Sequence, residues 1–256
     1  MEEIIIREQK QLCDCSDQNQ LQDIKQLADI SFRTQQRRRD ISLELVKTSK
    51  SQIHVDIGCA EGFITNALEE TLPNVLAFDL NPDYLEKAKV GSLKTEYCRA
   101  SVANLPLLDG SVDSISIFEV IEHLPMDVIH EGVTEMDRIL RVGGSLFISV
   151  PYRQRINYER CQKCGKWKPD NEAWHLHTFD ENVLNCLLPS NYQLIKVIKG
   201  PNFPLITCSK AFSRIPLYIW IPINKLVGCV RVGSRIFVKF VKCPEINDAT
   251  VKKKRS

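Results

Sequence analysis

The sequence has no excess of charge of one sign and no long apolar run. Its 256 residues carry 34 lysines and arginines against 32 aspartates and glutamates, a formal net charge of +2. A near-neutral chain lacks the overall field that holds a polyanion, so nucleic acid is not an expected partner unless a local patch binds it. The most apolar stretch, residues 215–223, is short and contains two prolines, so we expect no membrane-spanning helix.

We expect neither a secretion signal nor a disulfide framework. The chain opens on the acidic Met1-Glu2-Glu3, and the apolar run that follows is too short for a signal sequence. The ten cysteines are mostly scattered, without the regular spacing of a disulfide-stapled domain. We therefore expect a reducing, intracellular compartment and a cytoplasmic protein.

Between residues 51 and 200, short apolar runs alternate with segments of helical periodicity. This alternation predicts βαβ units and an α/β fold, a Rossmann-like, mostly parallel sheet with helices on both faces. The expected strands are 53–57, 75–78, 96–99, 112–118, 145–150, 193–198 and 234–241. The expected helices are 20–48, 63–70, 82–89, 128–140 and 180–188, with Gly143-Gly144 as a stop signal after the fourth.

Other segments flank or interrupt this core. Residues 1–50 are expected to form an N-terminal helical extension, whose Arg37-Arg38-Arg39 run is interpreted as a solvated face rather than a substrate or phosphate contact. A Cys/His-rich insert spans 152–178. Residues 201–245 hold an apolar, proline-interrupted segment and the last strand, and 246–256 form a basic tail. The apolar segment is interpreted as a lid on the sheet, or as a substrate channel or peripheral membrane contact.

The most informative segment is Ile53-His-Val-Asp56-Ile-Gly58-Cys59-Ala60-Glu61-Gly62. A buried strand runs into a glycine turn at the carboxyl end of a parallel strand, which is where open α/β sheets bind ligands. Gly58 and Gly62 allow a sharp turn and a close approach of the backbone to a ligand. The dinucleotide pattern G-x-G-x-x-G would need glycine at Ala60 and Phe63, so pyrophosphate binding is not expected.

A second acidic residue completes the pattern. In Val75-Leu-Ala-Phe78-Asp79-Leu-Asn81-Pro82, Asp79 ends the next strand, 23 residues after Asp56. A carboxylate at this place suits hydrogen bonding to both hydroxyls of a ribose. The two segments together indicate a ligand that has a ribose but no pyrophosphate.

These two segments, with residues 100–113, 118–124 and 138–144, resemble the class I S-adenosylmethionine-dependent methyltransferases of the type 11 kind. The resemblance covers about residues 50–200. It implies a seven-stranded, mostly parallel sheet with an antiparallel last strand, and S-adenosylmethionine as the cofactor. By position it implies the cofactor-binding residues Asp56, Gly58, Cys59, Ala60, Gly62, Asp79, Leu80, Ser101, Val102 and Glu119.

The resemblance also assigns parts of the cofactor to these residues. Asp56 and the two glycines would shape the pocket for the amino-acid part, and Asp79 would bind the ribose. Ser101 and Val102 would lie beside the adenine, although many relatives have an acid at the position of Ser101. Glu119 would close the pocket.

The acceptor is expected to be an oxygen of a small or lipid-like molecule. Enzymes that methylate amino groups of bases often carry an Asn/Asp-Pro-Pro-aromatic segment after the fourth strand, where this chain has Phe118-Glu-Val-Ile-Glu-His. Methyl transfer from a sulfonium mainly requires alignment of the nucleophile and the methyl group. A hydroxyl nucleophile also benefits from a general base.

Glu119, Glu122 and His123 are the candidate catalytic residues, and two interpretations of them stay open. Their spacing puts two carboxylates and an imidazole on one helical face, where they could bind a divalent cation, or they form a structural cap near the cofactor. The segment resembles that of ubiquinone-pathway O-methyltransferases and of small-RNA 3′-end 2′-O-methyltransferases. In the latter a further histidine arrives in an H-x-H-x-F segment, as in 175–179 here, so an alternative function is metal-dependent methylation of an RNA ribose with His177 as a further ligand.

The insert contains a pattern typical of a metal knuckle. Cys161 and Cys164 are three apart and are followed by glycine, and His175 and His177 are the nearest further ligands for zinc. A redox pair and a loop without metal are the other interpretations. A third hypothesis for the whole chain follows, a non-catalytic, zinc-stapled binding module.

Overall fold

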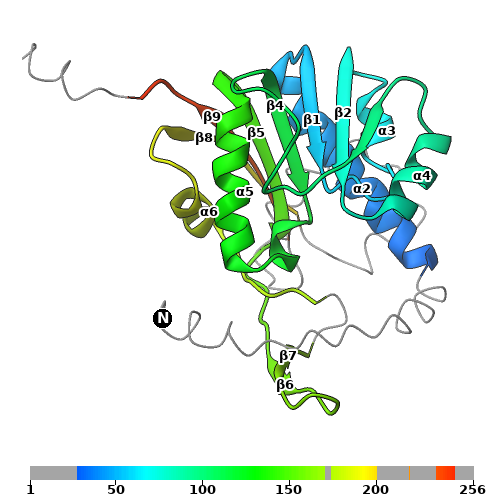
Figure 1. Ribbon diagram of the computed structural model, residues 1–256, viewed down its shortest axis with the longest axis vertical. Coiled ribbons are helices and arrows are strands. Elements are labelled where there is room, and N and C mark those ends of the chain that lie inside the picture. The colour runs from blue at the N-terminus through cyan, green and yellow to red at the C-terminus, as the bar shows by residue number, and fades with distance from the viewer. Residues whose placement is uncertain (1–27, 171–173, 201–218, 220–234, 246–256) are drawn as a thin grey trace, which may run out of the picture.

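Seven β-strands form a single sheet in the computed structural model, which describes residues 28–170, 174–200, 219 and 235–245. The strand order is β3-β2-β1-β4-β5-β9-β8, with β1 to β5 parallel to one another and β9 antiparallel to both of its neighbours (Figure 1). The strands are β1 (Ile53–Ile57), β2 (Asn74–Asp79), β3 (Glu96–Arg99), β4 (Val112–Phe118), β5 (Leu140–Pro151), β8 (Tyr192–Gly200) and β9 (Arg235–Lys242). The predicted α/β fold, with its antiparallel last strand, is confirmed.

Helices cover both faces of this sheet (Figure 1). Their bounds are α2 (Ala28–Val46), η2 (Lys47–Ser49), α3 (Thr65–Leu68), α4 (Pro82–Val90), η3 (Ile121–His123), α5 (Met126–Ile139) and α6 (Glu181–Leu187). Because neighbouring residues of a strand point to opposite faces, β5 contributes to two separate cores. Leu146 and Ile148 pack with α5 and α6, whereas Phe147 packs with Leu45 of α2 and Leu68 of α3.

The helix boundaries follow local capping chemistry at some ends and depart from expectation at others. Asn81 caps α4 by accepting from the Asp83 N–H at 2.9 Å, and Asp180 caps α6 by accepting from the Asn182 and Val183 N–H groups. The helix expected over 63–70 is shorter and covers only α3. The expected glycine stop after α5 is wrong, because α5 ends at Ile139 and Gly143-Gly144 lie inside β5.

The insert folds in part as a small hairpin of β6 (Tyr158–Arg160) and β7 (Trp167–Pro169), which projects away from the sheet (Figure 1). Most of the predicted lid, the first residues of the N-terminal extension and the basic tail lie outside the described residues. No helix in the described part of the chain has both the length and the apolar character needed to cross a bilayer.

Candidate cofactor site at the carboxyl edge of the sheet

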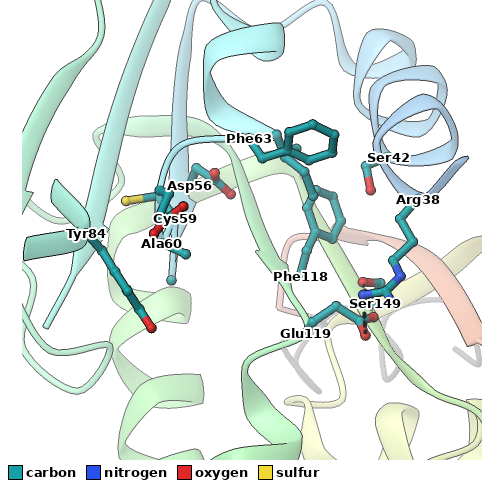
Figure 2. A pocket seen from close by; sticks show the side chains of 13 residues that line it. Arg38, Ser42, Asp56, Cys59, Ala60, Phe63, Tyr84, Phe118, Glu119 and Ser149 are labelled. Atoms are coloured by element: carbon teal, nitrogen blue, oxygen red, sulfur yellow. Dashed lines mark hydrogen bonds and ion pairs between the residues drawn. The ribbon is translucent and has the colours of Figure 1, made fainter. Parts of the chain in front are cut away.

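A cavity of about 380 Å³ lies at the carboxyl ends of β1 and β4, beneath α2 (Figure 2). Its walls come mainly from the loop after β1, the turn after β4 and the inner face of α2, with further residues from α4 and β5. The lining residues are Arg38, Ser42, Asp56, Gly58, Cys59, Ala60, Glu61, Phe63, Ile64, Tyr84, Phe118, Glu119 and Ser149. Five of the ten predicted cofactor-binding residues therefore share one cavity: Asp56, Gly58, Cys59, Ala60 and Glu119.

The loop after β1 needs its first glycine for two reasons. Gly58 has a φ of +74°, and a Cβ there would lie 2.3 Å from Cγ2 of Val120. The loop is tied to the end of β2, since the Gly58 N–H donates to the Phe78 carbonyl at 2.7 Å and the Ala60 N–H donates to Asp79 Oδ2 at 2.9 Å. Gly62, with a φ of +79°, ends the loop without lining the cavity.

Asp56 lies at the floor of the cavity and is only 4% exposed. Its two carboxylate oxygens accept hydrogen bonds from Ser116 Oγ at 2.5 Å and from Thr65 Oγ1 at 2.6 Å. Burial raises the pKa of Asp56 to about 6, against the opposing effect of these two hydrogen bonds. Burial also raises the pKa of the neighbouring Cys59 thiol, so that this cysteine stays protonated.

The other predicted cofactor residues lie beside the cavity rather than in its wall. Asp79 accepts from the Asn81 N–H at 2.8 Å in addition to Ala60, and Leu80 next to it is 57% exposed. Ser101 follows β3, and its Oγ accepts from the Ala103 N–H at 3.2 Å, whereas Val102 is buried in the core. These residues continue the carboxyl edge of the sheet beyond the enclosed part of the site.

Glu119 lies across the cavity from the glycine loop, directly after β4, with a φ of +59°. Its Oε1 accepts from Ser149 Oγ at 2.8 Å. Its Oε2 faces two guanidinium groups. Arg38 Nη1 lies 3.9 Å away (Figure 2), and Arg235 forms an ion pair with the same oxygen. One carboxylate therefore meets two cations in a half-buried setting.

The role of Arg38 was missed by sequence reasoning, which placed the whole arginine run on a solvated face. Its side chain is only 28% exposed and lines the cavity with Ser42, which lies one helical turn further along α2. Burial lowers the pKa of Arg38, although the charge of Glu122 opposes this effect. The sequence did hold a signal for this position. Arg38 and Ser42 each lie three residues before an apolar residue, Ile41 and Leu45, that packs α2 against the core.

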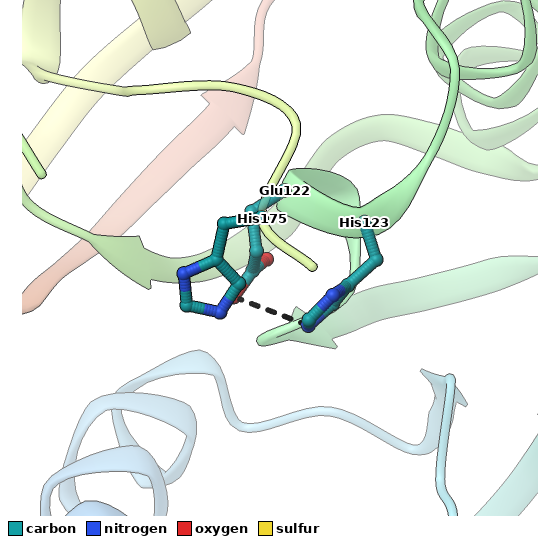
Figure 3. A group of neighbouring side chains, drawn as sticks. All are labelled: Glu122, His123 and His175. Carbon is teal, nitrogen blue, oxygen red and sulfur yellow. Dashed lines mark ion pairs between the residues drawn. The ribbon is translucent and has the colours of Figure 1, made fainter. Parts of the chain in front are cut away.

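A second group of titratable side chains lies beside this site. Glu122, His123 and His175 bring one ligand atom each to within 4.8 Å of one another (Figure 3). Glu122 is fully buried, and neither of its carboxylate oxygens has a hydrogen-bond partner among the described residues. Burial raises the pKa of Glu122 to about 8 and lowers the pKa of His175 to about 4.

This group differs from the predicted one in two members. Glu119 and Glu122 do not share a helical face, because only residues 121–123 form a helical turn and Glu119 precedes it in a left-handed conformation. His177 points elsewhere, with Nε2 2.9 Å from the Leu124 carbonyl oxygen. His175 takes the expected place of His177, with its ring 4.8 Å from that of His123.

The predicted zinc ligands are not brought together. Cys161 and Cys164 lie at the tip of the β6–β7 hairpin, where the Gly165 N–H donates to the Cys161 carbonyl at 2.8 Å. The segment of His175 is held on η3 instead, because the Leu176 N–H donates to the Glu122 carbonyl at 2.7 Å. In the described ranges, the cluster around Glu122 is the only group of three or more potential metal ligands, so the four predicted residues do not form one site.

Comparison with known proteins agrees with this geometry. Residues 55–148 match the family model described as "Methyltransferase domain". This match supports a class I S-adenosylmethionine-dependent methyltransferase domain over these residues. The methyltransferase match begins in β1 and ends in β5, so it contains the glycine loop, Asp79 and Glu119.

Several curated methyltransferases are similar to this chain over part of their length. A Mycobacterium tuberculosis protein named as a probable S-adenosylmethionine-dependent methyltransferase is 33% identical over 134 residues, which is 52% of this chain and 46% of the relative. A ubiquinone biosynthesis O-methyltransferase of Dechloromonas aromatica is 28% identical over 41% of this chain and 46% of its own length. A malonyl-[acyl-carrier protein] O-methyltransferase of Hamiltonella defensa is 28% identical over 63% of this chain and 61% of its own length. The chain thus spans about half the length of the first two.

Solved structures support the fold. The N-methyltransferase NodS from Bradyrhizobium japonicum superimposes with a TM-score of 0.55 over 82% of this chain and 97% of NodS, at 14% sequence identity. A second structure of NodS, in complex with S-adenosyl-L-homocysteine, superimposes with a TM-score of 0.54 over 82% of this chain and 88% of that one.

Proposed function

We propose that this chain is an S-adenosylmethionine-dependent O-methyltransferase with a small or lipid-like acceptor. The observation that carries the proposal is the cavity that joins the glycine loop, Asp56 and Glu119 at the carboxyl ends of β1 and β4. Methylation of oxygen is supported by the names of two relatives, the ubiquinone biosynthesis and malonyl-[acyl-carrier protein] O-methyltransferases. A lipid-like acceptor fits the first of these names.

The charges of the cavity suit the amino-acid part of the cofactor. Asp56 and Glu119 supply negative charge for an ammonium and a sulfonium group, and Arg38 supplies positive charge for a carboxylate. We therefore assign the amino-acid part to the enclosed cavity. We then assign binding of the ribose to Asp79, and binding of the adenine to Leu80, Ser101 and Val102 along the open edge.

Methyl transfer depends mainly on the orientation of the acceptor relative to the cofactor. The cofactor supplies a methyl group on a positively charged sulfur that is already a good leaving group, so this chain needs to hold the acceptor oxygen in line with it. Phe63 and Phe118 line the cavity and help to exclude water. His123, four residues after Glu119 and partly exposed, is the candidate base for the proton of a hydroxyl acceptor.

The first test is cofactor binding by the Asp79→Ala variant. Loss of the charge-assisted bonds to the ribose should weaken S-adenosylhomocysteine binding about ten- to hundredfold in a calorimetric titration. Asp83→Ala is a matched control, because Asp83 is an exposed acid at the start of α4. If Asp79→Ala binds within twofold of the wild type, the ribose assignment is wrong. If the wild-type chain does not bind the nucleoside, the hypothesis of a non-catalytic module is favoured.

The Glu122 cluster is the specific observation behind a second candidate function, metal-dependent methylation of a ribose hydroxyl. The donor set fits, since a buried carboxylate without a hydrogen-bond partner among the described residues lies beside two imidazoles. Glu122, His123 and His175 would hold the ion, which would supply Lewis-acid activation of an acceptor hydroxyl. The net charge of +2 offers little general attraction for RNA.

The second test is binding of Mn²⁺ followed by electron paramagnetic resonance. Glu122→Gln should weaken it at least tenfold, and Glu131→Gln, an exposed acid on α5, should not. Because the pKa of Glu122 is raised to about 8 and only the ionised carboxylate binds the ion, wild-type affinity should increase as the pH rises towards 8. Equal Mn²⁺ affinity in the Glu122→Gln and Glu131→Gln variants would contradict a metal site at the Glu122 cluster. Activity on RNA that falls steeply with salt would favour the ribose acceptor.

A further inference from the structure

A continuous line of polar side chains crosses the otherwise apolar core between β1 and β4. Ser51 Oγ lies 2.7 Å from Ser114 Oγ, which lies 2.6 Å from His54 Nδ1. On the other side of the ring, His54 Nε2 lies 2.9 Å from Ser116 Oγ, which donates to Asp56. All five side chains are buried, with exposed fractions of 0 to 4%.

Strand register explains why these residues meet. His54 pairs with Ser114 and Asp56 pairs with Ser116 across the two parallel strands. Alternate residues of a strand share one face, so the four side chains form a single polar stripe that ends at the cavity floor. A buried polar stripe in a central sheet lowers stability unless every member is satisfied, which makes a purely packing role a poor explanation.

Counting donors and acceptors sets the direction of this chain. The Asp56 carboxylate only accepts, and Ser116 gives its single proton to it at 2.5 Å. Ser116 must therefore accept from His54 Nε2, which places the ring hydrogen on that nitrogen. Nδ1 then accepts from Ser114. The Ser51 hydroxyl, which lies 2.7 Å from Ser114 Oγ, also donates to the Ile53 carbonyl at 3.1 Å. From Ser114 through His54 and Ser116, every hydrogen bond points towards Asp56.

The electrostatic surroundings agree with a neutral imidazole and an accepting carboxylate. Burial lowers the pKa of His54 to about 3, so the ring acts as a fixed dipole rather than as a charge. The groups around Asp56 are Thr65 and Ser116, which stabilise its ionised form, and Asp79, whose charge opposes it. The His54 dipole acts through Ser116 and adds to the stabilisation of ionised Asp56 by Thr65 and Ser116.

We propose that His54 is a positioning residue for cofactor binding, which acts through Ser116 to hold the Asp56 carboxylate in place at the floor of the cavity. The inference rests on the proposed function, because it assumes that the cavity takes the amino-acid part of the cofactor. His54 touches no ligand itself. Its effect on cofactor affinity depends on a donor at the Nε2 position and not on the rest of the ring.

Three variants separate the donor from the bulk of the ring. His54→Gln can place an amide N–H near the position of Nε2, whereas His54→Asn reaches only the Nδ1 side and His54→Phe keeps the ring without a donor. We expect His54→Gln to bind S-adenosylhomocysteine within about threefold of the wild type, and the other two about tenfold more weakly. Ser111→Ala, a serine just before β4 whose hydroxyl donates to the Leu108 carbonyl outside this line, is the control and should leave affinity unchanged.

A spectroscopic measurement on the wild-type protein does not depend on how the variants fold. Nitrogen-15 chemical shifts of His54 should report a neutral ring with the hydrogen on Nε2 between pH 5 and 8. A hydrogen on Nδ1, or His54→Phe with wild-type affinity, would overturn the inference while leaving the proposed function intact. Failure of the wild-type chain to bind the nucleoside would instead count against the proposed function.

Discussion

At the residue scale, the loop after β1 combines two glycines with a strained alanine. Ala60 has a φ of +46°, a region that costs a residue with a Cβ about 1–2 kcal/mol. In the sequence, Ala60 served to exclude a dinucleotide pattern, and the family resemblance placed it among the cofactor-binding residues. Its backbone conformation shows that a glycine-like turn is still made at this position, and that the surrounding loop tolerates the cost.

Two substitutions in this loop should differ in their effect on stability. Ala60→Gly relieves backbone strain but adds freedom to the unfolded chain, so the free energy of unfolding should change by less than about 1 kcal/mol. Gly58→Ala adds a methyl group that meets Val120, at a backbone position with a φ of +74°. It should lower the free energy of unfolding by about 2–4 kcal/mol. Urea unfolding curves measure both. A Gly58→Ala protein as stable as the wild type would contradict the geometry of the loop.

Also at this scale, the sequence predicted the residues that local chemistry marks and missed those that only packing selects. Gly58 and Asp79 stand out because a turn and a strand end require them. Arg38 does not stand out from its two neighbours in the arginine run, since the face of α2 that turns inward is decided by contacts distant in sequence. The exchange of His177 for His175 has the same origin, in how the segment docks on η3.

At the scale of elements, the connection between α4 and β3 is organised by one carboxylate. Glu69 accepts from Ser92 Oγ at 2.7 Å, from the Leu93 N–H at 2.9 Å and from the Thr95 N–H at 3.0 Å, and it is only 4% exposed. Burial alone would raise its pKa, but these hydrogen bonds together outweigh it and lower the pKa to about 2.

Replacing this carboxylate should give a pH-dependent loss of stability. Glu69→Gln should lower the free energy of unfolding by about 3 kcal/mol at neutral pH, because an amide accepts fewer of these bonds. The folded-state pKa is depressed, so the contribution is complete above about pH 4.5 and disappears as the pH falls towards 2. Urea unfolding at pH 7 and pH 3 measures the change. Glu70→Gln, an exposed neighbour, is the control, and a difference that stays constant with pH would contradict this account.

The glycine pair after α5 does not by itself distinguish the end of a helix from an irregularity in a strand. Gly143 has a φ of +81°, as the predicted helix stop would require, yet it lies within β5. The pairing of β4 with β5 shifts register between Val112 and Ser114, which makes this stretch an irregularity in the strand. A helix terminus and a strand irregularity both favour glycine, so the local sequence is the same for either.

At the scale of the whole molecule, the alternation of apolar runs and helical segments was sufficient to predict the sheet. Each of the five inner strands pairs with a neighbour on either side, and the alternation along the chain reflects that requirement. The insert was harder, because sequence proximity suggested that Cys161 and His175 share a metal. The hairpin instead carries the cysteines outward while His175 stays on η3, a separation that only the three-dimensional path of the chain decides.

The site also joins distant parts of the chain. β9 lies between β5 and β8, its Arg235 pairs with Glu119, and its Lys239 donates to Thr48 Oγ1, just after α2, at 2.9 Å. During synthesis, therefore, Glu119 gains its partner Arg235 only when β9 has left the ribosome. Nascent chains that stop before β9 would carry every glycine-loop residue without this ion pair, so ligand capture by such chains would report whether β9 has been made.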